Sequence, residues 1–373
     1  MKIKSFEFSL RELSGAMGDF GTLFPLSVGY IAVCGMNPAG FLVLMGLANL
    51  VTGLVYHLPL PIEPMKAIAA VAIAQAWPPS MIYAAGFTMG LVWLLFAATG
   101  VVDWIARYTP PCIVRGIQFS LAALLLVQAF RMMATGWLWS VVALALILLL
   151  RDNRFAPAGL VLMALGLGLA FFRGELRGIA PPRLQLPPLT SFTLAEMWQA
   201  FLQAGLAQIP LTAANAVIAT AALIKTYWPE HPVAERKLAL NHGFINVIVP
   251  FFGGFPLCHG AGGLAGQYAF GARTGGANVL EGSIEIALGL FLSPSIAQLF
   301  SVFPQAIIGA MLCYVGLQLL KGAKALSWNE ELLFVALTVL VSVLSNMALG
   351  YLAGMAAYHL TQRLRKRLSV AQD

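Results

Sequence analysis

Glu63 and Lys66 are charged residues in a stretch that otherwise holds proline and apolar side chains, PLPIEPMKAIAAVAI, which begins at Pro59. Proline donates no backbone hydrogen bond and fixes φ, so we expect extended chain up to Pro64 and a helix only beyond it. A carboxylate and an ammonium this close in sequence can form a structural ion pair. The ammonium can also bind an anionic ligand, and the residues alone leave both interpretations open.

The composition around this stretch is that of an integral membrane protein. Of the 373 residues, 60% are hydrophobic and 10% are charged, and the mean hydropathy is +0.83. Soluble domains carry about 25% charged residues. The sequence contains no GxSxG, HExxH or Walker motif, so we expect neither an enzyme nor a bound cofactor or metal. The four cysteines show no CxxC pairing and are interpreted as buried free thiols.

A transmembrane helix needs about 20 apolar residues, and a half-helix needs fewer. On this basis we predict an all-α polytopic protein with fourteen membrane segments, several of them short. The predicted segments are 13–34, 38–57, 65–77, 81–103, 111–131, 136–150, 157–172, 200–224, 236–252, 260–271, 278–300, 304–320, 330–345 and 347–362.

The distribution of basic residues tests this count. If the N-terminus is cytoplasmic, most of the 22 lysines and arginines fall in loops on the inner side. Both termini are therefore predicted to be cytoplasmic, and the net charge of +7 needs no nucleic-acid partner. Residues 364–373 are expected to form a basic tail against the lipid headgroups.

The two halves of the chain resemble each other weakly. Pro61 aligns with Pro256 and Pro111 with Pro304, at offsets of 195 and 193 residues. We therefore predict two repeats, 1–172 and 200–363, joined by an external linker at 173–199. Seven segments in each repeat would give the second copy the opposite orientation, which is an inverted repeat typical of secondary transporters.

The mate of the opening stretch is GGFPLCHGAGGLAG, from Gly253, where extended chain should give way to a helix near His259. Extended chain inside a bilayer needs protein partners, and the two short strands could provide them by pairing. Two half-helix N-termini would then face each other and form an anion site. Lys66 would contact the anion or pair with Glu63 or Asp19, and His259 would donate to the anion or cap its own helix.

Three segments resemble signatures of the molybdate transporter family, a branch of the sulfate permease and uracil permease superfamily. They are ELSGAMGDFGTLFPL from Glu12, PLPIEPMKAIAAVAIA from Pro59 and FPLCHGAGGLAGQYAFGARTG from Phe255. The resemblance implies a core domain (segments 1–4 and 8–11) and a gate domain (segments 5–7 and 12–14). It also implies uptake of the oxyanion molybdate by alternating access across the cytoplasmic (inner) membrane.

The resemblance further implies a set of substrate-binding positions in segments 1, 3, 8 and 10. Asp19 and Glu63 are expected to serve as coupling groups or ion-pair partners; glutamine is usual in the family where Glu63 stands. The predicted substrate-binding residues are Gly21, Thr22, Pro64, Met65, Lys66, Ala67, Gln208, Thr212, Asn215, Cys258, His259, Gly260, Ala261 and Gly262.

Several alternatives remain open at this stage. Sulfate or tungstate would suit the same site as molybdate, because all three are tetrahedral dianions. A nucleobase is disfavoured, since the segments AQIPLTAAN and PLCHGAGG offer no carboxylate for a base N–H. A channel-like anion conductor is the rival class of function, and a homodimer is left open as an assembly.

Overall fold

The computed structural model describes residues 2–3, 6–16, 20–150, 158–176, 180–320 and 331–370. Helices dominate the described chain, and each predicted segment coincides with helical structure. In the first half the helices are α1 (Leu10–Ala16), α2 (Phe20–Ala32), α3 (Pro38–Tyr56), α4 (Lys66–Gln75), α5 (Pro79–Thr99), α6 (Val101–Tyr108), α7 (Pro111–Met133), α8 (Trp137–Leu150) and α9 (Ala158–Phe172).

The second half opens with one long helix whose hydrogen-bonding pattern changes along its length. It consists of α10 (Leu194–Ala200), the π-helical η2 (Phe201–Gly205), α11 (Leu206–Leu211), the π-helical η3 (Thr212–Ala219) and α12 (Thr220–Tyr227). The elements that follow are α13 (Glu235–Ile248), the 3-10 helix η4 (Val249–Phe252), α14 (Ala261–Phe270), α15 (Gly276–Ser301), α16 (Gln305–Leu320), α17 (Glu331–Leu344) and α18 (Met347–Val370).

Three boundaries differ from the sequence prediction. The segment predicted at 81–103 ends at Thr99, because Gly100 takes a left-handed conformation (φ 71°) that closes α5, and the separate helix α6 follows. The long helix starts inside the predicted linker, where Thr193 and Glu196 form a capping box. The predicted tail is helical as far as Val370.

Five helical stretches of the described chain are long and apolar enough to cross a membrane. Several other apolar helices are shorter, among them α4, α8 and α17. The long stretches are Pro38–Tyr56, Pro79–Thr99, Pro111–Met133, Leu194–Tyr227 and Gly276–Leu299.

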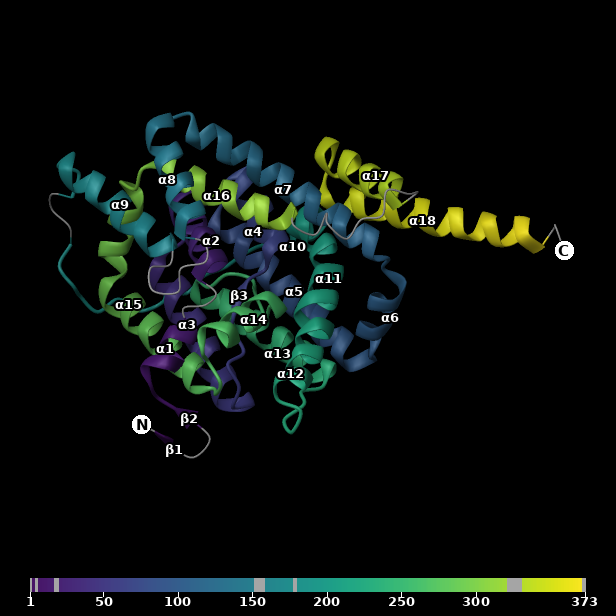
Figure 1. The fold of residues 1–373 in the computed structure, drawn as a ribbon, viewed down its shortest axis with the longest axis horizontal. Helices are drawn as coiled ribbons and strands as arrows, with labels where there is room; N and C mark the ends of the chain where they lie inside the picture. Colours follow the sequence, from purple (N-terminus) through teal and green to yellow (C-terminus); the bar gives the residue numbers. More distant parts are fainter. Residues whose placement is uncertain are drawn as a thin grey trace.

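The helices form two packed groups (Figure 1). In one group α3 packs along α15, and α5 packs along α13. In the other group α7 packs along α16, with α8 against α16 and α17 against α7. The α7, α8, α16 and α17 helices lie along the upper side of Figure 1, and the last turns of α18 extend away from the body. Each long pair therefore joins one helix from each half of the chain.

Glycines set the spacing of the α3–α15 pair. A Cβ on Gly46 would overlap the carbonyl oxygen of Gly282, and a Cβ on Gly53 would overlap that of Gly275. Small residues of this kind allow helix backbones to approach closely, which strengthens packing where no hydrophobic effect acts between helices in lipid.

Two small antiparallel sheets complete the fold. The strands β1 (Lys2–Ile3) and β2 (Phe6–Glu7) form a hairpin near the N-terminus, which the sequence did not predict. The strands β3 (Glu63–Pro64) and β4 (Leu257–Cys258) pair with each other at the centre of the fold. The second pair brings the starts of α4 and α14 together.

Candidate functional site

The β3–β4 pair is the element that positions the candidate site. Glu63 lies opposite Cys258 and Pro64 opposite Leu257, and the N–H of Met65 donates to the carbonyl of Pro256 at 2.9 Å. The extended segment predicted from the prolines therefore pairs its backbone hydrogen-bonding groups with the second extended segment, β4. Because α4 starts directly after β3 and α14 shortly after β4, the two helix N-termini lie on either side of this short sheet.

Two buried asparagines brace the outer edges of the strands. Asn49 on α3 accepts the N–H of Ile62 at 3.0 Å. Asn246 on α13 accepts the N–H of Leu257 at 2.8 Å and donates to the carbonyl of the same residue at 2.7 Å. Sequence reasoning missed both residues. Their signal is a strongly polar side chain inside an otherwise apolar predicted segment.

Glu63 and Lys66 form an ion pair between β3 and the first turn of α4. The Lys66 Nζ lies 2.6 Å from the Glu63 Oε2, with side-chain exposures of 27% and 1%. The other carboxylate oxygen, Oε1, accepts no hydrogen bond from the described residues. A Cβ on Gly260 would overlap this carboxylate. The Glu63 carboxylate therefore lies between the ammonium and the start of α14.

The N-terminus of α4 is closed by a side chain from the long helix. Gln208 accepts the N–H of Ala67 at 2.8 Å and donates to the Thr212 hydroxyl, also at 2.8 Å. These three predicted site residues are thus brought together. Asn215 lies further along η3, is half-buried, and its carbonyl accepts the Thr220 hydroxyl at 3.0 Å. The π-helical segments are a rare form that is frequent at functional sites.

The N-terminus of α14 is open by contrast. Its N-cap, Gly260, is extended and has no side chain, and no side chain of the described residues accepts from the first amides of the helix. The first bond along the helix runs from the Leu264 N–H to the Gly260 carbonyl. Gly262 is exposed, and a Cβ there would meet nothing within 4 Å. The first amides of a helix have no partner within it and carry the positive end of the helix dipole. The start of α14 therefore suits an anion.

His259 is bound to protein groups at both ring nitrogens. Its Nδ1 lies 3.2 Å from the Pro61 carbonyl and its Nε2 lies 2.8 Å from the Asn241 Nδ2. A carbonyl can only accept, so Nδ1 donates and Nε2 accepts from the amide. The His259 N–H donates to the Nε2 of His242 at 3.0 Å. In this structure His259 fastens β4 to α13 and to Pro61, and its predicted donation to an anion remains a prediction.

The other predicted site residues are distributed as follows. Pro64, Met65 and Cys258 are buried in the strand pair, and the Cys258 thiol lies 3.7 Å from the Pro64 carbonyl. Gly21 and Thr22 lie in the first turn of α2, where the structure describes only the backbone. Asp19 lies outside the described residues.

Two buried carboxylates on α15 were missed by the sequence analysis. Asn49 donates to Glu285 at 2.9 Å, and Gln267 of α14 donates to Glu281 at 3.1 Å. Asn278 on the same helix donates to the Leu60 carbonyl at 2.5 Å. Side chains of α15 thus form hydrogen bonds both with the chain that leads into β3 and with α14. Two glutamates within one predicted membrane segment were the signal that could have found them.

The fold defined by this geometry is that of membrane anion transporters. The transmembrane domain of a cyanobacterium bicarbonate transporter, BicA, superposes with a TM-score of 0.70 over 92% of this chain and 97% of its own, at 14% identity. SLC26A9 superposes with a TM-score of 0.74 over 98% of this chain and 66% of its own chain, at 12% identity. The murine Slc26a9 anion transporter in the inward-facing state superposes with a TM-score of 0.71 over 98% of this chain and 70% of its own chain, at 11% identity.

The sequence comparisons identify the family. The model of the molybdate transporters of the MFS superfamily matches residues 11–126 and 200–319, and the chain belongs to this family. Molybdate transporter 2 of Arabidopsis thaliana is 31% identical over 93% of this chain and 86% of its own length. Molybdate transporter 1 of Chlamydomonas reinhardtii is 28% identical over 92% of this chain and 90% of its own length. The resemblance in the sequence is thereby confirmed, and these relatives are transporters rather than enzymes.

Proposed function

We propose that the protein is a secondary transporter that takes up molybdate across the cytoplasmic membrane by alternating access. The observation that carries this proposal is the β3–β4 pair, which sets the uncapped start of α14 beside the Lys66 ammonium. Backbone amides and one ammonium recognise charge and shape rather than a particular base or side chain. The family assignment supplies the preference for molybdate over other oxyanions.

In the proposed complex the oxyanion approaches α14 along Gly262. No Cβ intervenes there, so oxygen atoms can reach the first amides of the helix. Lys66 adds a full positive charge from the facing half-helix. Gln208 is hydrogen-bonded to the start of α4 and to Thr212, so in this proposal these two side chains hold that half of the site in place. Gly260 and Ala261 would contribute backbone groups at the start of α14.

We propose that uptake is coupled to protons through Glu63. The carboxylate neutralises Lys66 and presents an unpaired oxygen toward the Gly260 backbone, where a dianion would be repelled. A proton on Glu63 would remove that repulsion and end the neutralisation of Lys66 by this carboxylate. The neighbouring titratable group on the β4 side, His259, is held by Pro61 and Asn241 and does not offset the carboxylate.

We propose fourteen segments in a seven-plus-seven inverted repeat, with both termini cytoplasmic. Equivalent contacts at corresponding positions support the repeat. Asn49 and Asn246 each brace the N–H of a strand residue, Ile62 and Leu257 respectively. Helix pairing repeats in the same way: α3 with α15 corresponds to α13 with α5, and α8 with α16 corresponds to α17 with α7.

The two packed groups of helices are the proposed core and gate domains, and their contacts suggest which state is present. The α4 half-helix packs on α7, whereas the described residues of α14 and α16 make no comparable contact. In the proposed topology α14 runs from the membrane centre to the cytoplasmic side. We infer an inward-open state, in which the substrate site faces the cytoplasm through the gap beside α14.

Uptake of labelled molybdate into proteoliposomes with an imposed pH gradient tests the proposal. Saturable uptake that competes with tungstate, and less with sulfate or uracil, is expected. Stronger competition by sulfate would reassign the substrate to the near alternative that shares the same geometry. Uptake that rises linearly with concentration would instead indicate a channel-like conductor. No uptake, together with no change in melting temperature on adding molybdate, tungstate or sulfate, would overturn the proposal.

A further inference from the structure

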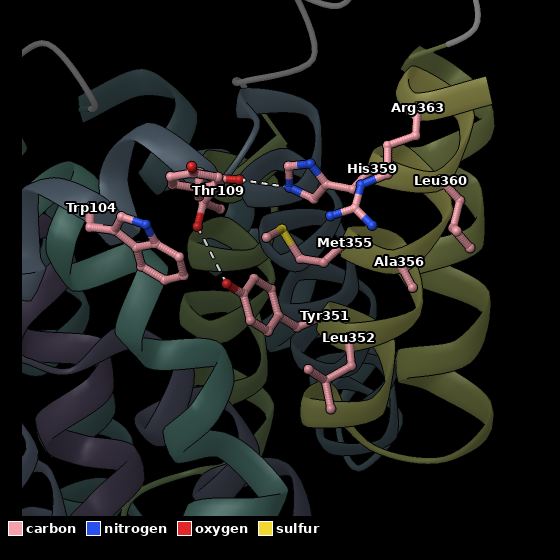
Figure 2. A pocket seen from close by; sticks show the side chains of 10 residues that line it. Trp104, Thr109, Tyr351, Leu352, Met355, Ala356, His359, Leu360 and Arg363 are labelled. Carbon is pink, nitrogen blue, oxygen red and sulfur yellow. Dashed lines mark hydrogen bonds between the residues drawn. The ribbon is translucent and has the colours of Figure 1, made fainter. Parts of the chain in front are cut away.

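A groove lies between α6 and α18, away from the strand pair (Figure 2). Its cavity volume is about 580 Å³. Trp104 of α6 lies on one wall, and one face of α18 forms the other. Tyr108, also on α6, lines the groove as well. The lining residues are Trp104, Tyr108, Thr109, Tyr351, Leu352, Met355, Ala356, His359, Leu360 and Arg363.

The groove has an apolar part and a basic end. Along α18, Leu352, Met355, Ala356 and Leu360 present carbon and sulfur atoms, and Leu352 and Leu360 are 49% and 58% exposed. The other end carries Arg363, which has no hydrogen-bond or ion-pair partner among the described residues. None of the described lining residues is acidic. Among them, Arg363 is the one arginine or lysine, and it stands at the end of a long apolar surface.

Two hydrogen bonds join the walls of the groove and fix their separation. The His359 Nε2 donates to the Tyr108 carbonyl at 3.0 Å, and the hydroxyls of Thr109 and Tyr351 lie 3.3 Å apart. The Nε2 of His359 is thereby committed to the contact between the walls, and Arg363 is the cationic donor at this end of the groove.

We propose that this groove binds one anionic phospholipid, with its phosphate at Arg363 and an acyl chain along Leu352 and Ala356. Arginine matches phosphate geometry with its planar fork of donors. Trp104 and Tyr108 are residues that gather at the membrane–water interface. In the proposed topology the groove opens to the inner leaflet, where anionic lipids attract basic segments. The site is separate from the anion site at α14, and its occupancy does not depend on the identity of the substrate.

The position of the groove gives the lipid a consequence for transport. The α6 helix is the link between α5, in one packed group, and α7, in the other. It also contacts η3, and α18 contacts η2 and α11 of the same long helix. A lipid bridging α6 and α18 would therefore stiffen the link on which one group moves against the other.

The test measures lipid binding to the purified full chain by native mass spectrometry in a neutral detergent. Dioleoyl phosphatidylglycerol and dioleoyl phosphatidylcholine are titrated separately, and inorganic phosphate is added in a third series. We expect the first phosphatidylglycerol to bind about tenfold more tightly than phosphatidylcholine, the effect of one charge-assisted contact. Arg363→Gln should remove that difference, and Ala356→Trp, which fills the groove, should weaken both lipids.

Arg365→Gln is the matched control, because it removes one charge from the same helix at a position that does not line the groove. It should keep the preference for phosphatidylglycerol. Equal loss in Arg363→Gln and Arg365→Gln would overturn the proposal in favour of general charge attraction. Full competition by inorganic phosphate would make the occupant a free anion. If the protein shows no lipid preference but forms a dimer that Arg363→Gln dissociates, the occupant would be a second copy of the chain. A free anion or a second copy as the occupant would each overturn the lipid proposal.

Discussion

The two half-helices that meet at the strand pair differ at their N-termini, although they follow corresponding strands. The α4 terminus is buried and capped: Gln208 occupies the Ala67 amide, and the helix packs on α7. At the α14 terminus no side chain of the described residues caps the helix, and Gly262 is exposed, with nothing within 4 Å of an added Cβ. The charge distribution is reversed, since the lysine stands on α4 and no charged side chain stands in the first turn of α14.

This difference separates two tasks within one site. The α4 half supplies fixed charge from a rigid, packed position, and the α14 half supplies free amides at an accessible position. A helix start that is already capped adds little to anion binding, because its donors are occupied. We therefore expect substitutions at the two termini to have different effects. Those at α4 should change the charge of the site, and those at α14 should change how closely the anion approaches the helix.

The largest effect is expected for Lys66→Met. Loss of the ammonium should reduce molybdate uptake about a hundredfold or more. It also leaves the Glu63 carboxylate buried without its ion-pair partner, which costs about 3–5 kcal/mol in the free energy of unfolding. Proteoliposome uptake and the melting temperature are the measurements. The double variant Glu63→Gln/Lys66→Met should recover the melting temperature but not the uptake; recovery of both would mean that Lys66 has only a structural role.

A smaller effect is expected at the open terminus. Gly262→Val places a side chain where the anion should approach, so KM should rise about tenfold through one lost charge-assisted bond. The melting temperature should hardly change, since nothing lies within 4 Å of the new Cβ. Gly168→Val on α9 is the control, because that glycine also faces open space. Unchanged KM in Gly262→Val would move the substrate away from α14.

Glu63→Gln should alter the dependence on pH more than the maximal rate. In the native chain, KM for molybdate should fall as the pH is lowered, because a proton on Glu63 removes the carboxylate charge that repels the dianion. With glutamine, KM should be low throughout, severalfold below the native value at neutral pH and nearly independent of pH. Uptake kinetics across a pH series measure this change. An unaltered pH profile would remove Glu63 as the coupling group.

The smallest effect is expected for Gln208→Leu at the capped terminus. The Ala67 amide and the Thr212 hydroxyl each lose a partner, which should lower the free energy of unfolding by about 1–2 kcal/mol. KM should change less than in Gly262→Val, because this amide is already occupied in the native site. Thermal unfolding and uptake are measured together. An increase in KM larger than that of Gly262→Val would reverse the assignment of the two termini.

The prolines made the central feature predictable from sequence. Pro59, Pro61 and Pro64 cannot form a continuous helix, and the offset to Pro256 identified the partner segment. The glycines after His259 likewise indicated a helix start open to a ligand. These features follow from backbone chemistry, which a single sequence carries directly.

The bracing residues could not be predicted in the same way. Asn49, Asn246 and Glu285 each form bonds that depend on which helices pack together, and one sequence does not specify that packing. The closure of α4 by Gln208 is similar, because the bond spans the two halves of the chain. The separate helix α6 was missed because the apolar pattern continues past Gly100, where only the left-handed backbone ends α5.

The glycine contacts between α3 and α15 also bear on how the protein is made. Gly46 of α3 packs against Gly282 and Ile286 of α15, and Gly90 of α5 lies against Val247 of α13. Neither helix of the first half can complete its packing until the ribosome has reached the second half, and α3 must wait until α15 has been made. The nascent chain must therefore enter the bilayer with unmatched surfaces, and assembly of these pairs becomes a late event in biogenesis.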